Sequence, residues 1–534
     1  MSENGQHPAW DVLLWLMIFL DEETCHRATA VRDPRFDGVF YLGVTSTGIY
    51  CRTVCRARRP KRENCRFFPH PASAELAGFR PCRLCRPEQA PGFTAAGEGA
   101  ELAAAAVRRI EDGALDDGDT LPTLAEELGI TSRHLRRVVR EHLGVSPVEL
   151  AQTQRLLMAQ RLLHTTRLPV SEIALACGFR SLRRCNALFL ERYGMPPTAF
   201  RRQSGSAAGV ETAERSLTVT LAYRPPFDWK ALLEYFADHA IPGAEHITPE
   251  SYARTLRIGG HTGWIKIMPE PGRDALRVEL AASLAPVLPA VLQAVRRTFD
   301  LDAVPSAINA VLEQDPLLAP SVASAPGLRL PGAADPFEGA VRTIIGQQVS
   351  VAAATTVMGR VVRAFGEPLS TPWPELNSLT LIAGRLAAQS VDILAPLGLN
   401  SGRANALLAL SRAVAEGKIH LRRSADPPRT MAQLEELPGI GPWTAHYIGM
   451  RMLGWPDAFL PGDLVVRKAL APLSPRRIAE YSRIWRPWRA YAVMHLWRTE
   501  MEKVKQSRSR QKMKSDFGNP ASGPGSQAFN LQSL

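Results

Sequence analysis

The spacing of hydrophobic residues changes along the chain and predicts which segments are helices and which are strands. Residues 101–202, and the chain from about residue 300 onward, place apolar side chains every three or four positions, as amphipathic helices do. Residues 217–300 begin with the alternating stretch "LTVTLAY" and continue as short strands separated by turn residues. The periodicity is lost near the C-terminus, and we expect residues 503–534 to form a disordered tail.

Two segments rich in small and turn-forming residues separate these regions. "PGFTAAGEGA" and "QSGSAAGVETAERS" predict linkers over residues 91–100 and 203–216. A chain of 534 residues is too long for one core, and 45% hydrophobic content is ordinary for folded protein. We predict a multidomain, mainly α protein with an extension and four domains. The expected ranges are 1–20 for the extension and 21–90, 101–202, 217–300 and 301–502 for the domains.

The apolar stretch "AWDVLLWLMIFL", residues 9–20, imitates a targeting signal. It is shorter than the roughly 20 residues that cross a bilayer. No basic segment precedes it and no small-residue cleavage site follows it. We interpret it as an extension and expect no membrane contact. Met17 is an alternative start, which N-terminal mass spectrometry of the native protein would test.

Charge and cysteine usage narrow the class of protein. The net charge of +12 points to an anionic partner, most simply nucleic acid, although a generally basic soluble protein would have the same composition. The last of the eight cysteines is Cys185. A disulfide-rich secreted protein would not confine its cysteines in this way. We therefore predict a reducing compartment, the cytoplasm, and a local metal site.

Four of the cysteines form two close pairs. Cys51 and Cys55 have three residues between them, Cys82 and Cys85 have two, and 26 residues separate the pairs. Paired cysteines at this spacing are typical of one Zn²⁺ held by four thiolates. Cys65 lies between the pairs and fits neither, so we expect it in the core.

The residues around these cysteines leave two interpretations of the metal site open. Most four-thiolate zinc sites are closed and structural. However, seven Arg or Lys side chains occur within residues 51–66, which suits contact with phosphate. Four thiolates on Zn²⁺ carry a net charge of about −2 and can be alkylated. Methylation of one sulfur would weaken repulsion from DNA phosphate, so an electrostatic switch is a hypothesis.

The segment from "FDGVFYLG" to "FRPCRLCRPE" resembles the N-terminal domain of the Ada adaptive-response family over nearly its whole length. The resemblance implies that Cys51 is both a zinc ligand and the acceptor of a methyl group from DNA methylphosphotriesters. It implies that Cys55, Cys82 and Cys85 are ligands only. Ada proteins usually end in an O6-methylguanine methyltransferase with a Pro-Cys-His-Arg active site, and this sequence lacks that motif.

The predicted helical domain contains two similar units, each with a tight turn. In "LPTLAEELGITSRHLRRVVREHLG", Gly129 suits the turn between two helices, and Thr131 or Ser132 can cap the second. Gly178 and Ser181 take these places in the second unit. Both units are therefore interpreted as helix-turn-helix motifs.

The helix after each turn is basic and suited to the major groove of DNA. The candidate contact residues are Arg133, Arg136, Arg137, Arg183 and Arg184. Two such units in tandem, ending in "RYGMPPTAFR", resemble the AraC-type regulator domain. The resemblance implies sequence-specific DNA binding and transcription activation, with RNA polymerase as a partner. Cys177 and Cys185 fall on the helical pattern, and we expect both in the core.

"LEELPGIGPWTAHYIGMRML" predicts two helices joined by a hairpin that Gly439 and Gly441 bracket. Such a turn points backbone N–H groups at one place and can bind DNA phosphate. A monovalent cation at the hairpin is a further candidate ligand. Asp463 follows Gly441 by 22 residues, after a Pro-Gly turn. Taken alone, Asp463 would be interpreted as a helix N-cap.

A hairpin with a downstream aspartate resembles the helix-hairpin-helix DNA glycosylases. Lyase-type members carry a lysine two positions after the second hairpin glycine and often bind an iron–sulfur cluster through C-terminal cysteines. This chain has Trp443 at that position and no cysteine in this half, which implies a monofunctional enzyme that uses water. From Leu217 to about Glu500 the chain resembles the DNA-3-methyladenine glycosylase II (AlkA) family, through "YRPPFDW", "GLRLPGAADPFEGAVRTIIGQQVS" and "WRPWRAYAVMHLWRTE".

The AlkA resemblance implies roles for five residues. A flipped, positively charged base prefers aromatic walls, which Trp443, Tyr447 and Trp497 would supply, although core packing is the alternative for each. Asp463 would stabilise an oxocarbenium-like transition state and orient or deprotonate water. Gln348 takes the place of an apolar residue that enters the minor groove in the family prototype, and we expect it to fill that gap.

These features predict a fusion protein in the bacterial cytoplasm, associated with the nucleoid. A small zinc-bound α+β domain would sense methylated DNA phosphate, and an AraC-type tandem helix-turn-helix domain would activate transcription. A small α+β domain and an all-α helix-hairpin-helix glycosylase domain would remove alkylated purines from double-stranded DNA. Two alternatives stay open: a regulator whose glycosylase half only binds DNA, and a repair enzyme whose helix-turn-helix motifs only aid its search.

Overall fold

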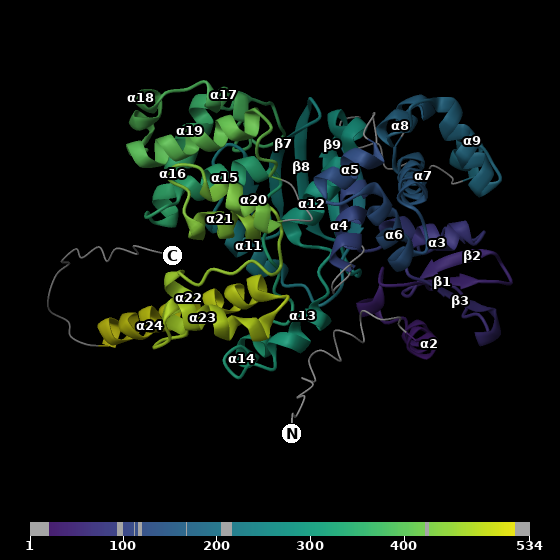
Figure 1. The fold of residues 1–534 in the computed structure, drawn as a ribbon, viewed down its shortest axis with the longest axis horizontal. Coiled ribbons are helices and arrows are strands. Elements are labelled where there is room, and N and C mark those ends of the chain that lie inside the picture. Colours follow the sequence, from purple (N-terminus) through teal and green to yellow (C-terminus); the bar gives the residue numbers. More distant parts are fainter. Residues whose placement is uncertain are drawn as a thin grey trace.

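The computed structural model describes residues 21–92, 100–111, 113–115, 120–166, 168–203, 216–421 and 427–517. We call residues 21–92 the cysteine module, 100–203 the helix-turn-helix module and 216–517 the C-terminal module. The three modules lie against one another (Figure 1). The predicted extension and most of both linkers lie outside the described residues. In the part that is described, no helix is long and apolar enough to cross a bilayer.

The cysteine module is a small sheet with two helices. The strand order is β3-β1-β2-β4, and all pairs are antiparallel except β2 with β4. Its elements are α2 (Glu22–Val31), β1 (Tyr41–Val44), β2 (Ile49–Arg52), β3 (Cys65–Phe68), α3 (Pro71–Leu76) and β4 (Arg80–Pro81). The prediction that Cys65 lies in the core is wrong. It is half-buried on β3, which is an edge strand of this sheet in the part of the chain that the structure describes.

The helix-turn-helix module contains helices only, among its described residues. They are α4 (Ala100–Glu111), α5 (Leu121–Glu127), α6 (Ser132–Leu143), α7 (Pro147–Thr165), α8 (Val170–Ala176), α9 (Leu182–Tyr193) and α10 (Pro197–Gln203). Gly129 and Gly178 have φ of 69° and 75°, the left-handed region that favours glycine in a tight turn. The side chains of Thr131 and Ser181 accept backbone N–H bonds at the starts of α6 and α9. Both predicted turns and both caps are confirmed.

The C-terminal module begins with a five-stranded antiparallel sheet of order β5-β9-β8-β7-β6. Its strands are β5 (Ser216–Ala222), β6 (Glu245–Ile247), β7 (Tyr252–Ile258), β8 (His261–Pro269) and β9 (Ala275–Ala281), with α11 (Trp229–Asp238) and α12 (Leu288–Phe299) beside them. Val219 and Leu221 on β5 are buried, whereas Thr218 between Leu217 and Val219 is exposed and Thr220 is half-buried, which explains the alternation in the sequence.

The remainder of the C-terminal module is helical apart from the two-residue strands β10 (Glu367–Pro368) and β11 (Ser378–Leu379). Two hydrophobic clusters divide this part into two lobes. The first lobe contains α15 (Pro336–Ile345), α16 (Val351–Phe365), α17 (Ala383–Ala387), α18 (Val391–Leu394), α19 (Ser401–Ala415), α20 (Pro427–Glu435) and α21 (Pro442–Arg451). The second contains α13 (Pro305–Leu312), α14 (Ala319–Ser324), α22 (Leu464–Ala469), α23 (Pro475–Tyr481) and α24 (Arg489–Phe517).

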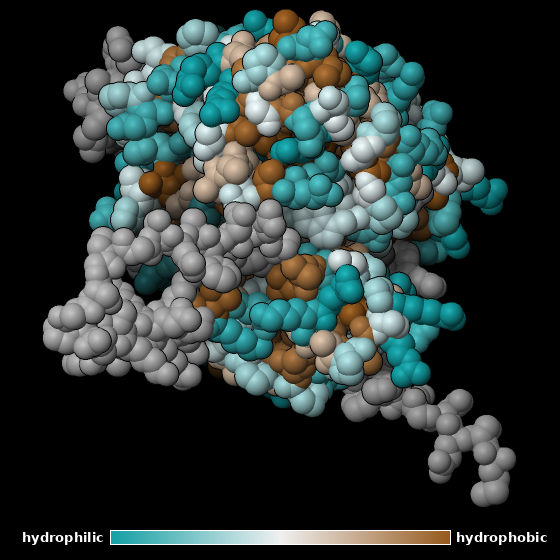
Figure 2. All heavy atoms as spheres, turned by 90° about the vertical axis from the view of Figure 1, so that its left-hand side faces the viewer, coloured by the Kyte–Doolittle hydropathy of each residue, from teal (hydrophilic) through white to brown (hydrophobic). Residues whose placement is uncertain are grey.

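The predicted disordered tail is partly wrong, because α24 continues to Phe517. The segment after residue 502 is rich in Lys, Arg and Gln, which favour helix even without an apolar stripe. Residues 518–534 lie outside the described part of the chain. Figure 2 views the molecule from the left-hand side of Figure 1 and shows hydrophobic side chains scattered among hydrophilic ones on the visible face.

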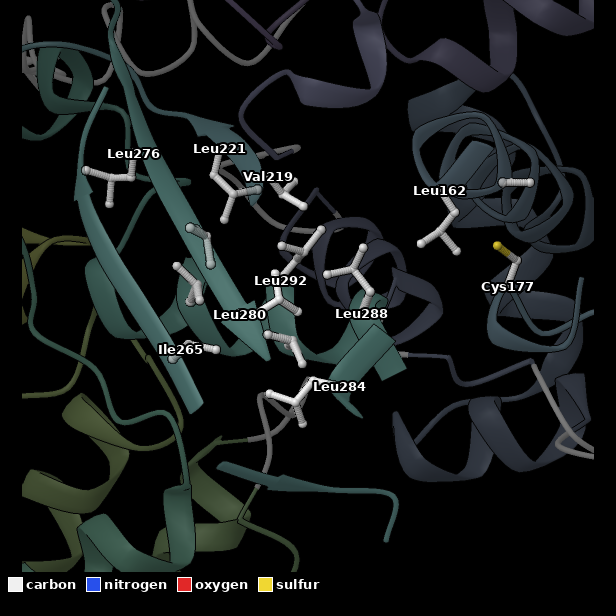
Figure 3. Packing of buried hydrophobic residues seen from close by; sticks show 14 of the residues in the cluster. Leu162, Cys177, Val219, Leu221, Ile265, Leu276, Leu280, Leu284, Leu288 and Leu292 are labelled. Atoms are coloured by element: carbon white, nitrogen blue, oxygen red, sulfur yellow. The ribbon is translucent and has the colours of Figure 1, made fainter. Parts of the chain in front are cut away.

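The helix-turn-helix module and the C-terminal sheet share one hydrophobic core. Figure 3 shows Leu162 and Cys177 in the same cluster as Leu284 and Leu288. Cys177 and Cys185 are both buried, as predicted. Because the apolar faces of the two modules are buried against each other, the two modules form one packed unit.

Candidate functional sites

The four predicted zinc ligands form one cluster, with ligand atoms within 4.8 Å of one another. Cys51 lies on β2, and the parallel pairing of β2 with β4 brings Cys82 beside it, where the Cys82 N–H donates to the Tyr50 carbonyl at 3.0 Å. The sulfurs of Cys55 and Cys82 are 3.9 Å apart. A tetrahedral zinc site requires roughly 3.8 Å between sulfurs. The donor set and its geometry therefore fit Zn²⁺.

The cluster is held in place by Arg52, next to Cys51 in the sequence. Its backbone N–H donates to Cys85 Sγ at 3.4 Å, and its guanidinium donates to the Cys85 carbonyl at 3.2 Å. The same guanidinium forms a buried ion pair with Asp37. Nothing in the sequence pattern marks Asp37, because it lies outside both cysteine pairs and reaches the site only through the fold.

Accessibility differs between the four cysteines. Cys51, the predicted methyl acceptor, is 7% exposed, whereas Cys55 is half-buried. Hydrogen bonding with the Cys51 thiol lowers the pKa of Cys55 to about 7. A methyl donor would have to reach Cys51 through the small exposed part of that residue.

The predicted DNA-contacting arginines lie on the exposed surface of the two helices that follow the turns. The exposed residues of α6 include Arg133, Arg136 and Arg137, and those of α9 include Arg183 and Arg184. The buried faces of the same helices include Leu135 and Phe189, so each helix is amphipathic with its basic face outward. This geometry suits insertion into a major groove.

Asp463 lies at the start of α22 and accepts four hydrogen bonds. Its Oδ1 accepts from the backbone N–H groups of Val465 and Val466 and from Trp497 Nε1, each at 3.0 Å. Its Oδ2 accepts from Trp443 Nε1 at 3.0 Å. The helix N-cap role is confirmed, and the same carboxylate is held by two of the predicted pocket aromatics.

The three predicted aromatic residues lie in a row beside this carboxylate. The rings of Trp443 and Tyr447 stack with centroids 5.1 Å apart, and those of Tyr447 and Trp497 are 6.1 Å apart. Trp443 is 38% exposed. The Trp443 ring is therefore partly open to solvent, and its contact with a flipped base stays a prediction.

The hydroxyl of Tyr447 belongs to a hydrogen-bonded polar cluster that sequence analysis missed. The hydroxyl of Tyr447 is 3.1 Å from that of Tyr235 on α11, and the buried Arg451 guanidinium donates to both. His239 stacks on Tyr235 at 4.2 Å, and burial lowers the pKa of His239 to about 4. Tyr235 is more than 200 residues from Tyr447 in the sequence, so only the fold brings the two hydroxyls together.

The hairpin has the predicted form. Gly439 has φ of 79°, and a Cβ there would lie 2.8 Å from the Cβ of Ala406. Gly441 is the N-cap of α21. The Gln347 side chain donates to the Gly439 carbonyl and to Thr444 Oγ1, both at 3.0 Å, and so joins the α15–α16 turn to the hairpin.

Gln348 follows in the same turn and is exposed. Its φ of 55° lies in the left-handed region, which a residue other than glycine seldom adopts. Such strain in an exposed turn is typical of functional sites. The turn thus presents Gln348 beside the hairpin to which Gln347 is bonded.

Three family models match the chain. The metal binding domain of Ada matches residues 24–88, a helix-turn-helix domain matches residues 124–203, and the AlkA N-terminal domain matches residues 218–335. These matches confirm the three predicted resemblances.

A probable bifunctional transcriptional activator/DNA repair enzyme AlkA from Mycobacterium tuberculosis is 38% identical over 501 residues, which cover 91% of this chain and 98% of the relative. The chain belongs to this bifunctional AlkA family. Other relatives correspond to its parts. DNA-3-methyladenine glycosylase 2 from Escherichia coli is 38% identical over 53% of this chain and 97% of its own. The Escherichia coli bifunctional transcriptional activator/DNA repair enzyme Ada is 35% identical over 26% of this chain and 37% of its own.

Among solved structures, a 3-methyladenine DNA-glycosylase from Archaeoglobus fulgidus aligns with 52% of this bifunctional AlkA-family chain and with 96% of its own, at 19% identity and a TM-score of 0.45.

Proposed function

We propose that this protein excises alkylated purines of the 3-methyladenine type from double-stranded DNA, senses DNA methylphosphotriesters and activates transcription in response. Membership of the bifunctional AlkA family supports all three activities. The observation that carries the enzymatic part is the convergence of Asp463 with Trp443, Tyr447 and Trp497.

The proposed excision step depends on how the two carboxylate oxygens of Asp463 are bonded. An alkylated purine is positively charged, so it stacks on the aromatic rings and leaves without much acid catalysis. Three donors hold Oδ1, whereas within the described part of the chain Trp443 is the one donor to Oδ2. Displacing that one bond frees Oδ2 to stabilise the developing positive charge on the sugar and to orient or deprotonate water.

DNA would bind at the hairpin and at the neighbouring turn between α15 and α16. The backbone around Gly439 and Gly441 would bind phosphate, and a monovalent cation there stays a prediction. Gln348 would fill the space that the flipped base leaves and bond to the orphaned partner base. Its exposed position on a turn bonded to the hairpin supports this role.

For the sensing step, zinc would hold four sulfurs as thiolates, and the Cys51 sulfur would attack the methyl carbon of a phosphotriester. A carbon–sulfur bond forms, the carbon–oxygen bond breaks, and the phosphate leaves as an ordinary diester anion. The product is a thioether, so Cys51 acts once. The basic surface in residues 51–66 supports binding to the DNA backbone.

The regulatory part would place the exposed arginines of α6 and α9 in major grooves of a promoter and recruit RNA polymerase. Their exposure supports DNA contact. This activity implies a cytoplasmic protein that is associated with the nucleoid.

The excision proposal is tested with Asp463→Asn and a matched N-cap control. Asp335 caps α15 by accepting from the N–H groups of Phe337 and Glu338, but no pocket aromatic donates to it. We expect Asp463→Asn to slow base release from methylated duplex DNA by at least about a hundredfold, because the charge that stabilises the transition state is lost. Asp335→Asn should excise at close to the wild-type rate.

Binding of both variants to the methylated duplex is measured in parallel by fluorescence anisotropy. Affinity close to wild type for Asp463→Asn, together with the loss of excision, supports a catalytic role. Excision by Asp463→Asn at the wild-type rate would refute it. A wild-type protein that binds but never excises would favour the alternative of a regulator with a non-catalytic glycosylase half.

A further inference from the structure

A buried arginine joins the C-terminal module to the cysteine module. Arg224 follows β5 and is 1% exposed. Its Nε donates to the carbonyl of Asp37 at 2.9 Å, and one terminal nitrogen donates to the carbonyl of Gly92 at 2.8 Å. The other terminal nitrogen donates to the carbonyl of Asp302 at 2.7 Å. One guanidinium therefore holds two separate segments of the cysteine module against the C-terminal module.

A second arginine and an aspartate complete this contact. Arg296 on α12 donates to the Ala90 carbonyl at 2.8 Å and pairs with Asp302 at 2.6 Å. Asp302 also accepts the Gly92 N–H at 2.8 Å, and a Cβ on Gly92 would lie 2.6 Å from its carboxylate. Such close fitting across the two modules indicates a specific interface.

Hydrogen bonds connect this contact between the modules to the zinc ligands. Asp37 accepts Arg224 through its carbonyl and pairs with Arg52 through its carboxylate. Arg52 in turn bonds to the sulfur and to the carbonyl of Cys85. Asp37 and Arg52 are each buried, so water does not compete for these bonds. Arg224, Asp37, Arg52 and Cys85 thus form a continuous chain of hydrogen bonds between the modules.

We propose that Arg224 is a positioning residue for the zinc thiolate site. The C-terminal module holds Asp37, Asp37 holds Arg52, and Arg52 orients Cys85. Partners that orient metal ligands contribute strongly to metal retention. Because coupling between two binding events is reciprocal, zinc bound in the cysteine module also stabilises the C-terminal module. The inference depends on zinc binding and on this interface, and it holds whether or not the protein excises bases.

Zinc release from the full-length, zinc-loaded protein tests the proposal. Transfer of zinc to a colorimetric chelator is followed for wild type and Arg224→Met. We expect Arg224→Met to release zinc about tenfold faster or more, in line with the loss of an outer partner of a metal ligand. Arg277→Met is the matched control, since Arg277 lies half-buried on the same sheet and, among the described residues, its ion-pair partner is Glu270 of the same module.

A second control separates positioning from general destabilisation. Val278 is fully buried in the same sheet, and its truncation to Ala should weaken the C-terminal module without touching the chain of hydrogen bonds. Equal acceleration of zinc release by Val278→Ala and Arg224→Met would overturn the proposal. So would release from folded Arg224→Met at the wild-type rate.

Cobalt gives a readout that a purely structural role would not change. Co²⁺ bound to the four thiolates absorbs visible light according to its coordination geometry. Arg224→Met should shift or broaden that spectrum, whereas Val278→Ala should leave it unchanged. Identical spectra for wild type and Arg224→Met would contradict the positioning role. If Arg224→Met does not fold, Arg224→Lys carries the same expectations, because lysine cannot reproduce the three-carbonyl contact.

Reciprocal stabilisation is measured by tryptophan fluorescence. Every tryptophan in the described residues lies between Trp229 and Trp497, in the C-terminal module. In a Trp10→Phe, Trp15→Phe background, emission therefore reports unfolding of that module alone. Removing zinc should lower its melting temperature by several degrees when Arg224 is present and by much less in Arg224→Met. Equal shifts in the two proteins would overturn the coupling.

Discussion

At the scale of single residues, Glu75 connects two modules through one buried carboxyl. Its Oε1 accepts from the hydroxyls of Tyr50 at 3.1 Å and Tyr193 at 3.4 Å. Its Oε2 is buried and has no hydrogen-bond partner within the described part of the chain. Burial raises the pKa of Glu75 to about 7 from the ordinary 4.5. The charged form of this carboxyl therefore weakens the contact between the cysteine and helix-turn-helix modules.

The shift predicts a pH dependence of stability. Because the folded state binds the Glu75 proton more tightly, Glu75 disfavours folding increasingly as pH rises from 4.5 through about 7. Glu75→Gln keeps an acceptor for both tyrosines but does not titrate. Its advantage in free energy of unfolding over wild type should grow by about 2–3 kcal/mol between pH 5 and pH 8. Urea unfolding followed by circular dichroism measures this difference.

The exposed Glu63 provides the control for this experiment. Glu63→Gln should change the free energy of unfolding by the same small amount at both pH values. An advantage of Glu75→Gln that does not change with pH would show that the Glu75 carboxyl is not protonated in the folded protein.

At the scale of secondary-structure elements, the hairpin between α20 and α21 requires its two glycines for different reasons. Gly439 has a positive φ and no room for a Cβ, because Ala406 on α19 lies against it. Gly441 has φ of −92°, and a Cβ there would meet nothing within 4 Å. Gly439 is required because its backbone has a positive φ and a Cβ would collide with Ala406. Gly441 has room for a Cβ, so its side of the hairpin is open.

Alanine at each glycine distinguishes these two requirements. Gly439→Ala should lower the free energy of unfolding by about 1–3 kcal/mol and weaken DNA binding, since the hairpin must distort. Gly441→Ala should change stability by less than about 0.5 kcal/mol. A fall in DNA affinity without a loss of stability in Gly441→Ala would indicate that DNA approaches this glycine. Equal destabilisation by both variants would contradict the argument. Thermal unfolding and anisotropy titration measure the two effects.

At the scale of the whole molecule, the proposed function combines a methyl-acceptor site that reacts once with an excision site that acts repeatedly. Cys51 would accept one methyl group permanently, whereas Asp463 would serve many excisions. The two sites belong to modules that share buried contacts, through Arg224 and through the common hydrophobic core. The three modules are therefore packed together as one assembly.

The proposed switch is tested in cells with a promoter reporter. A methylating agent should induce the reporter with wild-type protein and with Cys65→Ala, because Cys65 lies outside the metal cluster. Cys51→Ala should abolish induction. Mass spectrometry of the wild type should find one methyl group on the Cys51 peptide, and zinc content is measured for each variant. Equal induction in wild type and Cys51→Ala would refute the switch and favour a helix-turn-helix module that only aids the search for lesions.

The features that sequence analysis predicted correctly are those encoded by local spacing. The two cysteine pairs, the turns at Gly129 and Gly178, and the hairpin glycines each depend on residues a few positions apart. Short-range geometry decides whether such residues can share a turn or form a close pair of ligands, whereas the meeting of the two cysteine pairs also requires the pairing of β2 with β4. The helical and strand-forming regions were predicted for the same reason, because burial on one face leaves a periodic pattern.

The tertiary structure decided everything that depends on segments distant in the sequence. Arg224 reaches Asp37, and Tyr235 reaches Tyr447 and Arg451, across about two hundred residues. No local pattern can indicate such pairs, since loop closure between distant positions is decided by packing of the whole chain. Cys65 was misplaced for a related reason, because whether a strand is central or at an edge depends on its neighbours in the sheet. The sequence by itself therefore determined the family, the metal ligands and the candidate catalytic carboxylate. Only the fold decided which buried partners hold them in place and how the modules contact one another.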